Sequence, residues 1–223
     1  MRAAEDASDR VAVAVERVQA RPQGRFAIPW HWWQKQLPGT IGEPVLAEMQ
    51  AEYPEGIGRE DLRSRAEGTA TGDGPRLLRL FVATMMWGVG TGDGRGPWRV
   101  AQGLRSEGAL DTIVATAALV REGDTAAAYR WFTRTPGRLD RIAGSFFTKW
   151  LWIVGAGNDL APEPLILDDQ VRASLLALQW CSDERGNLKE YLAYLEQAAQ
   201  WAASLGVAPE VIEEALFEAG GEL

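Results

Sequence analysis

The apolar residues of this chain recur at helical spacing in one short segment after another, and no run alternates long enough to predict a β-sheet. Proline or an N-capping residue opens most of these segments, and glycine or proline closes them. We therefore expect an all-α fold. The helical segments are predicted at residues 9–20, 29–37, 44–53, 60–67, 75–87, 97–107, 109–121, 125–133, 167–180, 188–205 and 209–219.

Only two very short pieces, Ile153-Val154 and Leu165–Leu167, are candidates for extended backbone. A chain of 223 residues can bury one good core or form two small lobes that share a cleft. No linker of distinct composition interrupts it, so we expect a single all-helical domain over residues 1–223. Its predicted form is a compact multi-helix fold with two helical lobes around a cleft.

The composition excludes several kinds of site. The single cysteine, Cys181, rules out an intramolecular disulfide and a four-cysteine cluster. The single histidine, His31, argues against a histidine-rich metal site and against a Ser-His-Asp triad. We expect no metal and no cofactor, so lysine, carboxylates and aromatic residues must carry any chemistry.

The chain carries no signal for a membrane or for export. No apolar run reaches the roughly 18–20 residues that a membrane helix needs, and the first ten residues are acidic and polar. One cysteine suits a reducing compartment. We expect a cytoplasmic protein that does not associate with membranes.

Charge is distributed unevenly along the chain. The net charge is −8, yet residues 1–149 carry 20 basic and 18 acidic residues, while residues 150–223 carry 3 and 13. Because local charge decides contact with phosphate, an acidic protein can still bind DNA through one face. Charge alone favours the other interpretation, a solvated surface that has no partner.

The stretch from Ile142 to Val171 holds the residues best suited to chemistry. Lys149 lies among aromatic residues of one segment, and Asp168 follows 19 positions later. A lysine kept from water can attack an electrophilic carbon as a neutral amine and form a Schiff base. The alternative is that the stem of Lys149 only covers apolar surface while its charge stays in water.

This stretch resembles the catalytic segment of the helix–hairpin–helix DNA glycosylases, nearest to their 8-oxoguanine branch. Gly144 to Lys149 reads G-S-F-F-T-K, and residues 164–171 read P-L-I-L-D-D-Q-V. Thr148-Lys149 matches the family's Thr-Lys, and the step to Asp168 matches its spacing. The family's second hairpin glycine is missing, and Ile153 replaces its cysteine one turn after the lysine.

The resemblance implies a base-excision repair enzyme. It would remove an oxidised purine like 8-oxoguanine from double-stranded DNA and cleave the strand as an AP lyase through a lysine Schiff base. Lys149 would be the nucleophile and Asp168 the catalytic acid, with Asp169 as the alternative. The catalytic hairpin segment would span about residues 138–180, and the protein would act as a monomer.

The resemblance also implies the residues that bind the substrate. Gln197 and Trp201, one helical turn apart, would read and stack on the extruded base; alternatively, Trp201 is a core residue and Gln197 a surface amide. Ile153 and Phe147 would complete the base pocket. The residues expected to contact DNA are Arg99, Arg134, Arg138, Arg141, Gly144 and Thr148. The competing hypothesis is an inactive helical protein that keeps the fold and binds DNA or a protein.

Overall fold

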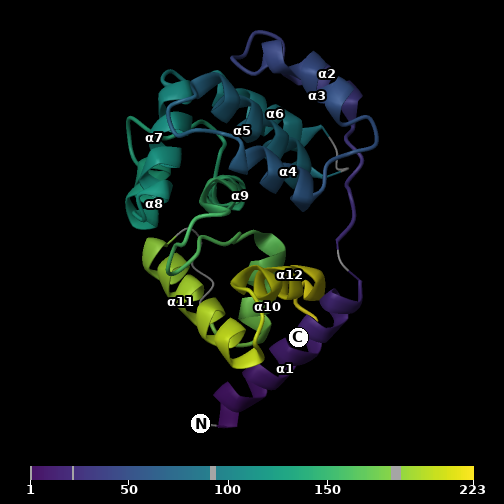
Figure 1. Ribbon diagram of the computed structural model, residues 1–223, viewed down its shortest axis with the longest axis vertical. Helices are drawn as coiled ribbons and strands as arrows, with labels where there is room; N and C mark the ends of the chain where they lie inside the picture. Colours follow the sequence, from purple (N-terminus) through teal and green to yellow (C-terminus); the bar gives the residue numbers. More distant parts are fainter. Residues whose placement is uncertain (1, 22, 91–93, 182–186) are drawn as a thin grey trace. The chain divides into compact units, whose positions relative to one another are not determined.

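The computed structural model describes residues 2–21, 23–90, 94–181 and 187–223 (Figure 1). These ranges contain twelve α-helices, one 3-10 helix and no β-strand. Phe26 and Ile57 pair through an isolated antiparallel bridge. The predicted all-α fold is therefore confirmed. In the same ranges, no helix is both long and apolar enough to cross a bilayer.

The helices follow one another with short connections. Their bounds are α1 (Arg2–Ala20), α2 (Trp30–Gln36), η1 (Glu43–Val45), α3 (Leu46–Glu52), α4 (Arg59–Glu67), α5 (Gly74–Val89), α6 (Arg95–Leu104), α7 (Ala109–Arg121), α8 (Thr125–Thr133), α9 (Gly144–Gly155), α10 (Asp169–Ala177), α11 (Leu188–Leu205) and α12 (Pro209–Ala219).

Helices are present in all eleven predicted segments, and their ends differ from the prediction. The segment around Lys149, which was not among the predicted ranges, forms the additional helix α9. Helix α1 begins at Arg2 rather than at residue 9, and α10 is shorter than the predicted 167–180. Asp124 and Asn187 cap α8 and α11, because each side chain accepts a backbone N–H of the first turn. The prediction of extended backbone at Ile153-Val154 was wrong, since both residues lie inside α9.

Contacts within the chain divide it into two compact units. One combines Met1–Gln23 with Leu160–Leu223, and the other is Gly24–Asp159. The first unit is therefore built from both ends of the chain and the second from its middle. Whether the two form one domain stays a prediction.

In the first unit, α12 packs against α1, α10 and α11 (Figure 1). Helix α1 contributes the buried residues Val11, Val15 and Val18, which recur at helical spacing. The hydroxyl of Ser174 on α10 donates a hydrogen bond of 2.5 Å to the carbonyl of Leu216 on α12. The unit is thus a small helical cluster around α12.

In the second unit, α5, α7 and α9 pack on one another, and α8 packs on α7 and α9. Trp150 of α9 joins these helices. Its ring meets Phe81 of α5 edge to face at 5.3 Å, and its indole N–H donates to Thr116 of α7 over 3.0 Å. This packing fixes the orientation of α9, and therefore the direction in which Lys149, the residue before Trp150, leaves the helix.

Candidate active site

Lys149 lies in the second turn of α9 and is only 6% exposed. Side chains on a helix lean toward its N-terminus, and the amine accordingly donates a hydrogen bond of 3.0 Å to the carbonyl of Ser145. Thr148 is also buried, and its hydroxyl donates to the carbonyl of Gly144 over 2.7 Å. The predicted nucleophile is thus held mostly out of solvent, with its amine turned back toward the start of α9.

The stem of Lys149 crosses α5 at Gly88. A Cβ atom at residue 88 would lie 2.5 Å from Cδ and 3.0 Å from Cε of the lysine. Real Cβ atoms do not approach carbon this closely. The lysine therefore occupies space that exists because residue 88 has no side chain.

A buried cation lies at the same helix pair, and sequence analysis did not find it. Trp87 of α5 and Trp152 of α9 stack at 5.4 Å, and the guanidinium of Arg59 lies 5.2 Å and 4.9 Å from their ring centres. Arg59 is only 8% exposed. Its two ring partners are distant in sequence, so no local pattern could have indicated this cluster.

The remaining predicted pocket residues of α9 lie in packed surroundings. Phe147 stacks on Phe132 of α8 at 5.1 Å and meets Tyr129 edge to face at 4.9 Å. Ile153 is completely buried. These contacts give both residues a structural role, and their contact with a base stays a prediction.

Arg121 of α7 fastens the other end of α9. Its guanidinium donates to the carbonyl of Val154 over 3.3 Å and to that of Ala66 over 3.5 Å. Burial lowers the pKa of Arg121 from its ordinary value. Sequence analysis did not single out Arg121, because the sequence alone does not distinguish an arginine with a structural role from a solvated one.

Residues 134–143 connect α8 to α9, and we call this connection the hairpin, after the element that the family resemblance implies just before Thr148-Lys149. A turn closes within it, where the N–H of Ile142 donates to the carbonyl of Leu139 over 3.3 Å. Arg141, inside this turn, has a φ of 62°, a left-handed conformation that glycine adopts most easily. The residue with left-handed backbone therefore precedes Gly144, the glycine that the family resemblance had picked out.

The hairpin is seated on α6. Ile142 lies so close to Gly103 that a Cβ there would be 2.5 Å from its Cγ1. The N–H of Asp140 donates to the hydroxyl of Ser106 over 2.9 Å. Arg141 lies over the ring of Trp98, 5.6 Å from its centre, and Trp98 is 40% exposed. These contacts fix the turn relative to α6.

The start of α9 has backbone N–H groups without a partner among the described residues. Helix α9 has no side-chain N-cap, and Phe146 and Phe147 are the first residues whose N–H groups bond within the turn, to the carbonyl of Ala143. The N–H groups of Gly144 and Ser145 are therefore available at a helix N-terminus, where anions bind favourably.

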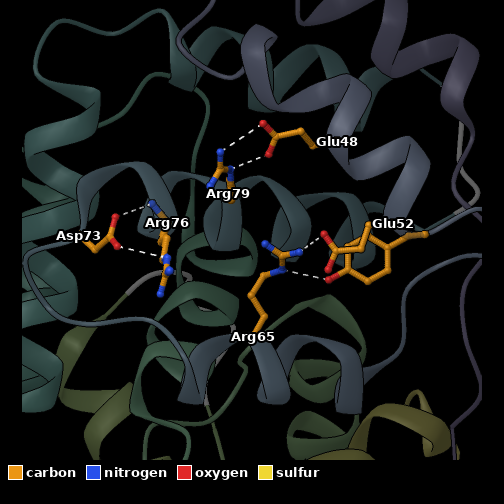
Figure 2. Close-up of polar contacts among 7 residues, drawn as sticks. Glu48, Glu52, Arg65, Asp73, Arg76 and Arg79 are labelled. Atoms are coloured by element: carbon orange, nitrogen blue, oxygen red, sulfur yellow. Dashed lines mark hydrogen bonds and ion pairs between the residues drawn. The ribbon is translucent and has the colours of Figure 1, made fainter.

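The four arginines predicted to contact DNA are all exposed: Arg99, Arg134, Arg138 and Arg141. None of the four forms an ion pair or a side-chain hydrogen bond with any residue in the described ranges. Other arginines of this unit are paired with carboxylates: Arg65 with Glu52, Arg76 with Asp73 and Arg79 with Glu48 (Figure 2). The four arginines therefore have no carboxylate partner among the described residues and can contact phosphate.

Asp168 belongs to the first unit and caps α10. Its carboxylate accepts the N–H groups of Gln170 and Val171 over 3.1 Å and 3.2 Å, and it is 9% exposed. Asp169, the alternative acid, is exposed in the first turn of α10. The sequence had placed both aspartates in this turn, and the structure gives them different surroundings.

Two buried tyrosines hold the segment that leads to Asp168. On α11, the hydroxyl of Tyr191 donates to the carbonyl of Leu165 over 2.9 Å, and that of Tyr194 to Ile166 over 3.2 Å. The position of Asp168 therefore depends on α11. Neither tyrosine was singled out from the sequence, although their i, i+3 spacing places them on one face of the helix.

The predicted base-reading pair also lies on α11. Gln197 is half-buried and Trp201 is 4% exposed. Both belong to the first unit with Asp168, whereas Lys149 and the hairpin belong to the second. The meeting of Lys149 with Asp168 stays a prediction.

A comparison with protein families gives one match. Residues 19–217 match the family described as "Putative 8-oxoguanine DNA glycosylase OGG-like protein". Comparisons with curated proteins and with solved structures find no match.

Proposed function

The chain belongs to the family of 8-oxoguanine DNA glycosylase-like proteins, and on this basis we propose that it excises an oxidised purine like 8-oxoguanine from double-stranded DNA. It then cleaves the strand as an AP lyase, acting as a monomer. The observation that carries the proposal is the position of Lys149. The residue is buried in the helix that follows the hairpin, and its amine lies at the start of that helix.

The hairpin binds the DNA backbone. Arg99, Arg134, Arg138 and Arg141 contact phosphates, while the N–H groups of residues 144 and 145 hold another at the start of α9. These groups carry no sequence information, which suits an enzyme that must find one damaged base among many intact ones.

The damaged base is then extruded, which costs a few kcal/mol of stacking and pairing. Gln197 reads the edge of the base and Trp201 stacks on its face. Phe147 and Ile153 support the pocket from behind, and Thr148 orients the start of α9 through its bond to Gly144.

The amine nitrogen of Lys149 attacks C1′ of the sugar. A C1′–N bond forms while the glycosidic bond breaks, and the base leaves with the bonding electron pair and takes up a proton. Opening of the sugar ring gives the Schiff base. Loss of a C2′ proton then expels the 3′ phosphate by β-elimination. Asp168 stabilises positive charge on the sugar and moves the proton.

Borohydride trapping tests the proposal. Wild-type protein with a duplex containing 8-oxoguanine is expected to give a covalent adduct, because borohydride reduces a Schiff base. Lys149→Gln should give none, while its melting temperature and its affinity for duplex DNA stay near wild type. An abasic-site duplex separates base removal from strand cleavage.

If wild-type protein forms no adduct with either duplex, the enzyme proposal fails. Salt-dependent DNA binding without an adduct would then support the inactive DNA-binding protein. The specific observation on that side is the non-glycine residue, Arg141, in the left-handed position of the hairpin turn.

A further inference from the structure

We infer that Gly88 is a positioning residue for Lys149. It leaves the space through which the lysine stem crosses α5, and so determines where the amine lies. The inference rests on the proposed function, because it assigns Lys149 the nucleophile's role.

The geometry allows no larger residue without displacing the lysine. A Cβ at residue 88 would meet Cδ of Lys149 at 2.5 Å and Cε at 3.0 Å. Backbone atoms are not the obstacle, since the nearest atoms all belong to this one side chain. Alanine would therefore leave α5 intact and push the lysine into another rotamer.

Neighbouring contacts prevent the two helices from separating to make room. Trp87, directly before Gly88, stacks on Trp152 of α9, and Trp150 is bonded to Thr116 of α7. Trp87 thus sets the distance between α5 and α9, and the missing side chain of Gly88 leaves room for the methylene groups of Lys149. Because these contacts hold the helices in place, a side chain at residue 88 would move the Lys149 amine away from the carbonyl of Ser145.

Glycine at this position has no backbone explanation. Gly88 lies inside α5 and is not among the residues with positive φ. Alanine favours a helix more than glycine does, so Gly88→Ala should stabilise α5 if nothing opposed it. A loss of stability on this substitution would therefore report the contact with Lys149.

The first experiment is a double-mutant cycle in melting temperature. Gly88→Ala should raise the melting temperature more in a Lys149→Ala background than in wild type, because the opposing stem is gone and only the higher helix propensity of alanine remains. Gly68→Ala is the matched control, because residue 68 has ordinary φ and its nearest neighbours are 3.8 Å away. Equal effects of Gly88→Ala in both backgrounds would overturn the inference.

The second experiment separates binding from chemistry. In single-turnover borohydride trapping on an abasic-site duplex, Gly88→Ala should slow adduct formation by about a hundredfold, the effect expected for a misplacement near 1 Å. The affinity for undamaged duplex should stay at the wild-type value, since no hairpin residue changes. A merely structural role would not separate these two quantities.

Each outcome is decisive. Thermal coupling together with slowed trapping supports the inference, whereas coupling with trapping at the wild-type rate overturns it. If Gly88→Ala fails to fold while the double variant with Lys149→Ala folds, the contact is supported by that rescue. If the wild-type protein also forms no adduct, the proposed function itself fails. Gly88 then has no nucleophile to position.

Discussion

Arg141 has a backbone conformation that glycine adopts freely and that costs most other residues about 1 kcal/mol or more. Its guanidinium lies over Trp98, and this contact offsets part of that cost. Strained residues often belong to functional sites, and the left-handed backbone of Arg141 fixes the direction of its side chain.

Replacing Arg141 with glycine should separate strain from function. We expect Arg141→Gly to raise the free energy of unfolding by about 0.5–1 kcal/mol, measured by urea titration, and to weaken binding to duplex DNA. Arg138→Gly is the matched control, since it removes the same charge from a residue without positive φ. It should weaken DNA binding without the gain in stability; equal stability changes in both variants would contradict this account.

Asp168 has two roles that different substitutions can distinguish. Asn keeps a side-chain oxygen for the helix cap and loses the charge, while alanine loses both. Asp168→Asn should keep wild-type stability and slow base release, whereas Asp168→Ala should also lose about 1 kcal/mol of unfolding free energy. Asp169→Asn should change neither, and a slow reaction in that variant would reassign the acid to Asp169.

Single-residue features differed in how well the sequence predicted them. The caps Asp124 and Asn187 were predictable, because capping depends on residue type and on the few residues that follow. The conformation of Arg141 and the burial of Arg59 were not. Each depends on a ring from a distant helix, Trp98 in one case and Trp87 with Trp152 in the other.

At the scale of elements, α9 shows how packing overrides local preference. The β-branched pair Ile153-Val154 favours extended backbone when considered alone. Both residues are fully buried in α9, which packs against α4, α5, α7 and α8. Burial on a helix already fixed by Trp150 decides their conformation, and no short window of sequence contains that information.

Helix α11 should hold Asp168 through its two tyrosines. We expect Tyr191→Phe and Tyr194→Phe each to lower the unfolding free energy by about 1–3 kcal/mol, because each leaves a buried carbonyl without its donor. Base release should slow further in the double variant. The check is urea unfolding alongside single-turnover kinetics. Wild-type rates in a destabilised double variant would show that α11 supports the fold without positioning the acid.

At the scale of the whole molecule, charge separates along the boundary between the two units. The unit of residues 24–159 holds 16 basic and 15 acidic residues, and the other holds 7 and 16. All of the net negative charge therefore belongs to the unit without the hairpin. The sequence indicated an acidic C-terminal third, and the structure adds the N-terminal segment to that same unit.

Despite the net charge, DNA binding should weaken steeply with salt. If Arg99 and the three hairpin arginines each contact one phosphate, the logarithm of affinity should fall with the logarithm of salt with a slope of about −3.6. This corresponds to about a hundredfold loss between 50 and 200 mM salt. Fluorescence anisotropy with an undamaged duplex measures it. Each arginine-to-alanine variant should reduce the slope by about 0.9, and an unchanged slope in all four would place DNA elsewhere on the protein.

The overall fold was predictable only in part. Helical periodicity was sufficient for the all-α class, since it is a local property of each segment. The division into units was not, because it depends on α1 packing against α12, at opposite ends of the sequence.

That pairing of the chain's two ends has a consequence for synthesis on the ribosome. The lysine-bearing middle can complete its contacts as soon as it has emerged, because all of its helices are consecutive. Helix α1 precedes this middle unit in the sequence, and its partner α12 follows it (Figure 1). A nascent chain would thus carry a folded Lys149 helix before α11 and α12 are available to hold the segment of Asp168.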